Sequence, residues 1–229
     1  MTAPAAPPLA RRLAAEGIGA FFLFATVIGS GIMAENLAGG NEAVALLANT
    51  LATGAILFVL ITMLAPVSGA HMNPAVSLVA AARGELRRSD AAAYIVVQLA
   101  LGILGAWAAH LMFDLPTLQL SVKARPGLGR LVGEFIATFG LILTILGTVR
   151  HRPQWVPASV ALYITAAYWF TSSTSFANPA ITVARSLSDT FAGIAPINVP
   201  AFVAAQLSGA ALAALAARYL FDERYRGKR

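Results

Sequence analysis

Long apolar stretches, separated by short polar segments, dominate the chain. A helix needs about 20 apolar residues to cross the roughly 30 Å hydrocarbon core of a bilayer. Six stretches are about this long, and they cover residues 13–33, 43–65, 91–113, 131–149, 155–173 and 199–221. We therefore predict an all-α membrane protein with six transmembrane helices.

The first stretch could instead be a secretory signal peptide, because Arg11 and Arg12 precede it. It is longer than the 7 to 15 or so apolar residues of a signal peptide, however, and it contains Glu16. We interpret it as a retained transmembrane helix.

Two of the connections, residues 66–90 and 174–198, contain a short apolar run of their own. Each run opens with Asn-Pro-Ala and continues over residues 76–82 or 181–187. The two motifs are Asn73, Pro74 and Ala75, and Asn178, Pro179 and Ala180. About ten residues span half a membrane, so each run predicts a re-entrant half-helix.

The chain also contains an internal repeat. The first and fourth spans share the pattern E-x-I-x-x-F-x-L-x-x-T-x-x-G, which starts at Glu16 and at Glu134. The third and sixth spans share Gln-Leu, which starts at Gln98 and at Gln206. We therefore predict a single domain over residues 1–229 that consists of two copies of one three-span unit, at about 11–113 and 130–221.

Each repeat has three spans, so the second repeat must enter the membrane from the opposite side. The two half-helices then dip in from opposite faces, and their N-termini meet near the midplane. Asn73 and Asn178 are expected at N-cap positions, with Pro74 and Pro179 as the first helical residues. Two positive helix ends would face one point.

Composition excludes several classes of protein. Of the 229 residues, 58% are hydrophobic and 11% charged, whereas a soluble domain carries about 25% charged residues. The chain has no cysteine and only three histidines, so we expect no metal site and no cofactor. The net charge of +6 is attributed to membrane topology and not to nucleic-acid binding.

Basic residues predict the orientation. An even number of spans places both termini on one side, and 12 of the 16 basic residues then lie on that side. The other four are Lys123, Arg125, Arg130 and Arg185. The positive-inside rule therefore predicts cytoplasmic termini. Arginine occurs 14 times and lysine twice, which together with abundant alanine favours a bacterial inner membrane.

The motif S-G-x-H-x-N-P-A-V at residues 68–76, together with the second Asn-Pro-Ala and the repeated glutamates, resembles the aquaporin and aquaglyceroporin (major intrinsic protein) family over nearly the whole chain. The resemblance implies a passive channel, not an enzyme. It also implies a homotetramer in membrane lipid, with one pore per protomer. In each pore Asn73 and Asn178 would donate hydrogen bonds to small neutral solutes.

Glu16 and Glu134 lie within predicted transmembrane helices, where an ionisable group is a functional hypothesis by default. One interpretation is a proton relay. The interpretation that we favour is that each glutamate accepts hydrogen bonds from the non-helical loop of its half-helix. Gln98, Gln206 and His71 are expected to brace the same loops.

The chain departs from the family pattern at the outer selectivity filter. Most members have arginine three residues after the second motif asparagine, but this chain has Ile181. The family's spacing places Thr53, Ala166 and Ser175 at the other filter positions. Such a set implies a wide opening. The pattern N-P-A-I-T-x-A-R at residues 178–185 most resembles the bacterial subgroup associated with arsenic resistance, which implies passage of arsenous acid, glycerol and water.

Arg185 leaves an alternative open. It lies four residues beyond Ile181, roughly 6 Å further along the helix and about 40° around it. Its side chain could refill the filter and make the channel selective for water or glycerol, or it could face the outer headgroups or loop carbonyls. A proton-coupled secondary transporter is a further alternative, since inverted repeats and broken helices occur there too.

Overall fold

Helices make up nearly all the regular structure in residues 7–221, the part of the chain that the computed structural model describes. The long helices are α1 (Leu9–Leu37), α2 (Glu42–Ser68), α4 (Arg88–Met112), α5 (Leu128–His151), α6 (Val156–Phe170) and α8 (Val199–Phe221). The short ones are α3 (Pro74–Ala82), α7 (Pro179–Ser186) and the 3-10 helices η1 (Pro153–Trp155) and η2 (Pro196–Asn198). The predicted all-α fold with two half-helices is confirmed.

One span is shorter than predicted. Within residues 7–221, five helical segments are long and apolar enough to cross a membrane, but α6 has only 15 residues. The apolar pattern suggested a helix up to residue 173, whereas Thr171 is already extended, with φ −105° and ψ 138°. The segment 171–175 is Thr-Ser-Ser-Thr-Ser, and these side chains favour turns over helix. This turn leads the chain back towards α7.

The helices of the two halves pack in matching pairs. α1 packs against α2 and α4, and α5 packs against α6 and α8. Each half-helix lies beside the last long helix of its own half, α3 beside α4 and α7 beside α8, and each also contacts that of the other half. The arrangement agrees with the repeat in the sequence.

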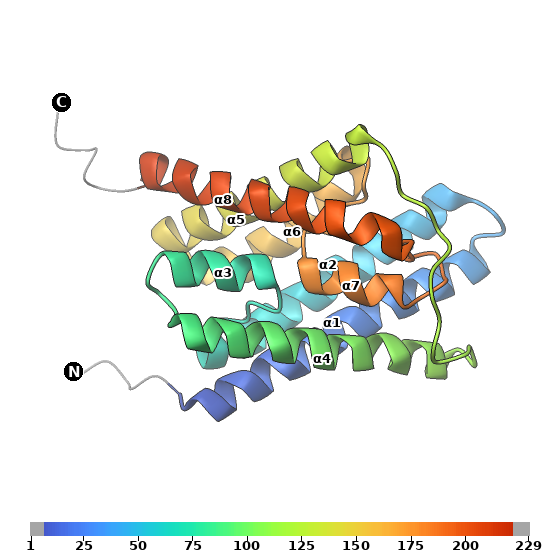
Figure 1. Cartoon of the computed structure of the whole chain (residues 1–229), viewed down its shortest axis with the longest axis horizontal. Helices are drawn as coiled ribbons and strands as arrows, with labels where there is room; N and C mark the ends of the chain where they lie inside the picture. The colour runs from blue at the N-terminus through green and yellow to red at the C-terminus, as the bar shows by residue number, and fades with distance from the viewer. Residues whose placement is uncertain (1–6, 222–229) are drawn as a thin grey trace.

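The half-helices lie between the long helices and point in from opposite ends of the molecule (Figure 1). We call the end with the start of α1 and the end of α8 the terminal end. The opposite end, which carries the connection 113–127, is the loop end. α3 lies towards the terminal end and α7 towards the loop end, so their N-termini face the middle.

Two glycines allow backbones to touch at helix crossings. A Cβ atom on Gly105 of α4 would lie 2.2 Å from the carbonyl oxygen of Phe21 in α1. A Cβ atom on Gly209 of α8 would lie 2.3 Å from the carbonyl oxygen of Phe135 in α5. A backbone carbonyl cannot swing aside as a flexible side chain can, so these contacts fix how closely the helices approach.

We therefore predict that Gly105→Ala lowers the stability of the protein by about 1–3 kcal/mol, because the added methyl group forces α1 and α4 apart. Thermal unfolding of detergent-purified protein measures the effect. Gly129→Ala is the matched control, since its Cβ atom would meet nothing closer than the Ser172 hydroxyl at 3.9 Å. Equal unfolding temperatures for the two variants would contradict the packing argument.

Candidate pore and its lining

The two motif asparagines cap the half-helices. The Asn73 Oδ1 atom accepts a hydrogen bond from the Ala75 amide at 2.9 Å, and the Asn178 Oδ1 atom accepts one from the Ala180 amide at 2.9 Å. Pro74 and Pro179 are the first residues of α3 and α7, where the missing N–H costs nothing. Both helix N-termini, with their partial positive charge, are thereby fixed at the middle of the molecule.

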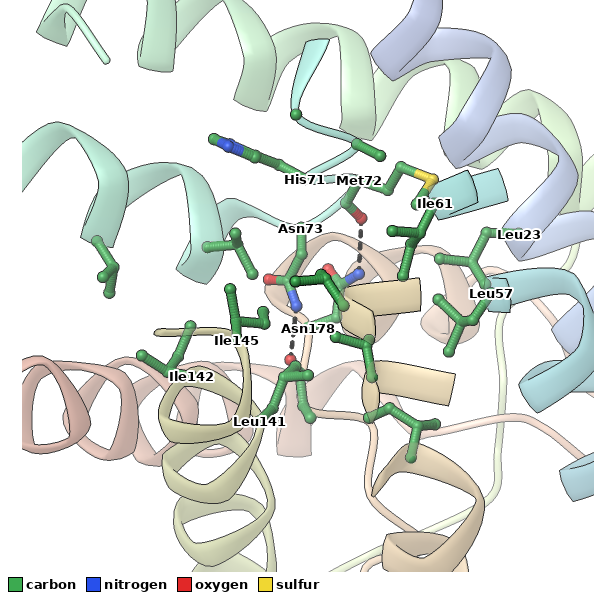
Figure 2. Close-up of a pocket in the computed structure, with 18 of the residues that line it drawn as sticks. Leu23, Leu57, Ile61, His71, Met72, Asn73, Leu141, Ile142, Ile145 and Asn178 are labelled. Atoms are coloured by element: carbon green, nitrogen blue, oxygen red, sulfur yellow. Dashed lines mark hydrogen bonds between the residues drawn. The ribbon is translucent and has the colours of Figure 1, made fainter. Parts of the chain in front are cut away.

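The same asparagines join the two halves of the chain. The Asn73 Nδ2 group donates to the Ala177 carbonyl at 2.8 Å, and the Asn178 Nδ2 group donates to the Met72 carbonyl at 2.8 Å (Figure 2). An amide NH₂ has two hydrogens, and the bond to the opposite loop uses one of them. The second makes no hydrogen bond within the described residues, and both asparagines line a cavity.

The loop before each half-helix has an unusual backbone. Ala70 and Met72 have φ of 49° and 48°, and the equivalent residues Ser175 and Ala177 have φ of 49° and 48°. Left-handed conformations of non-glycine residues cost of order 1 kcal/mol or more each and persist only where surrounding contacts impose them. Contacts with the rest of the molecule must therefore impose these conformations on both loops.

In the first half the buried carboxylate of Glu16 holds the loop. It accepts hydrogen bonds from the His71 amide at 2.9 Å and the Met72 amide at 2.6 Å. The Ser68 hydroxyl donates at 2.7 Å and the Gln98 side chain at 2.8 Å. The carboxylate thus satisfies backbone N–H groups that no helix can satisfy.

Glu134 does the same in the second half. It accepts from the Phe176 amide at 2.8 Å, the Ala177 amide at 2.9 Å and the Gln206 side chain at 2.6 Å. The two glutamines also donate to hydroxyl groups on the half-helices, Gln98 to Ser77 and Gln206 to Thr182. His71 Nδ1 lies 3.1 Å from the same Ser77 hydroxyl.

A cavity of about 470 Å³ runs past the asparagines. At the terminal end its wall includes Arg83, Glu85 and Arg150, and at the loop end it includes Arg185. Between them the wall is mostly aliphatic, and Figure 2 shows several of these side chains around the asparagine pair: Leu23, Leu57, Ile61, Leu141, Ile142 and Ile145. A few polar groups therefore interrupt a long apolar surface.

Three of the four expected filter residues, Thr53, Ser175 and Ile181, line the cavity near the loop end. The expectation for Ala166 is wrong, because this residue is exposed on the outside of α6. Tyr168 faces the cavity instead, and its hydroxyl lies 3.2 Å from that of Thr53. Two helical residues correspond to about 200° of rotation, so the family's ungapped spacing selected the wrong face of α6.

Arg185 belongs to the cavity wall and is 3% exposed. Its Nε group donates to the Ala192 carbonyl, and its guanidinium carbon lies 3.3 Å from the centroid of the Phe176 ring. Arg185 thus lines the cavity, as one alternative expected, and also bonds a loop carbonyl, as the other expected. Neither Tyr168 nor the Phe176 contact was expected from the sequence.

We predict that Glu134→Gln destabilises the protein, because the amide NH₂ would place a donor against the donors that now meet a carboxylate. Leaving one buried N–H unsatisfied costs about 1–3 kcal/mol. A lower unfolding temperature in detergent, with proton uptake by vesicles unchanged, is the expected result. Loss of proton uptake without loss of stability would instead support the proton-relay interpretation.

Comparisons with known proteins agree with this geometry. The Major intrinsic protein family profile matches residues 5–171. The chain is 55% identical over 214 residues to aquaglyceroporin AqpS of Rhizobium meliloti (strain 1021), which covers 93% of this chain and 91% of that protein. It is 31% identical over 248 residues to aquaporin AqpM of Methanothermobacter thermautotrophicus, covering 94% and 99%.

The structure of the aquaglyceroporin from Plasmodium falciparum superimposes with a TM-score of 0.75 at 18% identity, and covers 96% of this chain and 99% of that chain. This likeness shows the shared fold. With the half-helices, the paired asparagines and the cavity beside them, these matches show that the chain belongs to the major intrinsic protein family of membrane channels.

Proposed function

We propose that this protein is a passive channel for small neutral polyol-like solutes, namely glycerol and arsenous acid, and for water. The observation that carries the proposal is the amphipathic character of the cavity. Aliphatic side chains form most of the wall, while hydrogen-bonding groups recur at the asparagine pair and near Thr53, Tyr168 and Ser175. A polyol has both a hydrocarbon side and hydroxyl groups, so it suits such a wall.

The relative AqpS is named an aquaglyceroporin, which supports glycerol as a solute. Arsenous acid carries three hydroxyl groups and is neutral near pH 7, so it presents the same chemistry in a similar volume. Ile181 supports both solutes, because an isoleucine side chain at the filter narrows the path less than an arginine side chain does. It also places no fixed charge beside the solute.

Two features at the middle of the pore exclude cations and protons: the helix N-termini and the asparagine side chains. Two helix N-termini converge there and raise the local positive potential. The asparagine side chains, with one N–H group each towards the cavity, orient a passing water molecule as an acceptor. A file of water molecules that must reverse its orientation at this point conducts protons poorly.

Passive flow is favoured over proton-coupled transport by the environment of the two buried glutamates. Glu16 accepts four hydrogen bonds and Glu134 accepts three. A coupling site needs an acid that can gain and lose a proton as the solute moves, and these carboxylates are engaged in holding backbone.

We also propose that the terminal end is cytoplasmic and that the chain forms a homotetramer in a bacterial inner membrane. Described basic residues gather at the terminal end, among them Arg12, Arg83, Arg87 and Arg150. The basic residues at positions 224, 226, 228 and 229, which were predicted to be cytoplasmic, lie outside the described residues. One pore is formed within the single domain by its two repeats.

The test is stopped-flow light scattering of proteoliposomes with glycerol, arsenous acid, urea and water. We expect Ile181→Arg to slow glycerol and arsenous acid by about tenfold, which corresponds to about 1.4 kcal/mol of additional barrier. Ile197→Arg is the matched control, since it adds the same charge at the loop end from a residue that is 85% exposed and outside the cavity wall.

Passage of water alone, with glycerol and arsenous acid excluded, would contradict the wide filter and favour the alternative in which Arg185 restricts the opening. Accumulation of solute against its gradient when a proton gradient is imposed would contradict a passive channel and indicate a coupled transporter.

A further inference from the structure

Two arginines from distant parts of the sequence meet at one aromatic ring. Arg125 belongs to the connection 113–127 and Arg185 to α7. Their guanidinium carbons lie 5.0 Å and 3.3 Å from the centroid of the Phe176 ring. Both side chains are buried in the chain, with 9% and 3% of their surface exposed.

Their positions are fixed by neighbouring carbonyl groups. Arg125 Nε donates to the Gly193 carbonyl at 2.7 Å, and Arg185 Nε donates to the adjacent carbonyl of Ala192. The Arg125 backbone amide also donates to the side chain of Asn198 at 2.8 Å. Both guanidinium groups are therefore held rigidly, as the binding groups of a preformed site are.

Of the described carboxylates, Glu134 acts on both arginines electrostatically, but none forms an ion pair with either. Glu134 binds the amide of Phe176, but its oxygens already accept three hydrogen bonds. Two buried like charges near one ring are unfavourable unless an opposite charge joins them.

Arg185 also has donors to spare. Its one hydrogen bond within the described structure uses Nε, so both Nη groups have no protein acceptor there, and the residue lines the cavity. Ser175 lines the same end, and its hydroxyl makes no hydrogen bond within the described residues. Of the described residues in the cavity wall, only Glu85 carries a carboxylate, and it is paired with Arg83 at 2.7 Å.

We propose that the loop end of the cavity is a binding site for small monovalent oxyanions. The Nη groups of Arg185 form the donor fork, which suits two oxygen atoms of one anion. Arg125 lies outside the cavity wall and acts as a positioning residue that adds a second positive charge behind Phe176. The inference goes beyond the neutral solutes proposed above.

Nitrate is the probe, because it is planar, monovalent and fully ionised at any working pH, so no neutral form crosses the lipid. Proteoliposomes with valinomycin, which lets potassium follow the anion, receive a hyperosmotic pulse of potassium nitrate, and their reswelling is recorded. Glycerol flux is recorded in the same vesicles with and without nitrate. We expect nitrate either to enter faster than in protein-free vesicles or to inhibit glycerol flux saturably.

Arg185→Met should reduce that nitrate effect by about tenfold or more, because loss of a hydrogen bond to a charged group weakens binding by about this factor. Arg130→Met is the matched control, since it removes one arginine near the loop end from outside the cavity wall. Arg185→Lys keeps the charge but not the fork, and should restore part of the effect. Arg125→Met should weaken it less than Arg185→Met.

The absence of both nitrate entry and nitrate inhibition, in vesicles that still pass glycerol, would overturn the proposal. An unchanged nitrate effect in Arg185→Met would overturn it as well. Loss of glycerol flux in the unmodified protein would concern the proposed channel function instead, so the two failures are distinguishable. If Arg185→Met does not fold, the comparison of Arg185→Lys and Arg125→Met with the unmodified protein decides.

Discussion

The structure depends on one requirement: polar backbone that is not helical must find hydrogen-bond partners inside a membrane. Each half-helix is preceded by such backbone, bent through left-handed residues. A single buried carboxylate in each half, Glu16 or Glu134, accepts the freed N–H groups. Once these N–H groups have acceptors, the half-helix can begin in the middle of the bilayer. The start of the half-helix in turn determines the position of the asparagine at its N-terminus.

The asparagine pair then converts two separate half-helices into one constriction. Each side chain caps its own helix with its oxygen and donates to the opposite loop with its nitrogen. The oxygen and nitrogen groups of the two asparagine side chains therefore fix both the place of the constriction and the hydrogen-bonding groups within it. The surrounding aliphatic wall supplies no competing partner, so a solute in the cavity meets hydrogen-bonding groups only at defined depths.

Much of this could be predicted from the sequence because it repeats. Each repeat has one glutamate, one Asn-Pro start and one half-helix in the same order, and the pattern that begins at each glutamate has identical spacing in both. Short-range spacing of this kind determines local structure. The filter could not be predicted as well. Ala166 was placed by counting across a turn, where a difference of two residues reverses the helix face and brings Tyr168 inward.

The grouping of Arg125, Phe176 and Arg185 could not be predicted either. Arg125 and Phe176 are 51 positions apart, in an irregular connection and a loop, and no periodic sequence pattern links such segments.

The exchange of hydrogen bonds between the loops has a consequence for synthesis. Asn73 finds its acceptor at Ala177, over a hundred residues later. While the ribosome is still making the second half, the first loop lacks this partner, so the central constriction can close only after the second half has inserted.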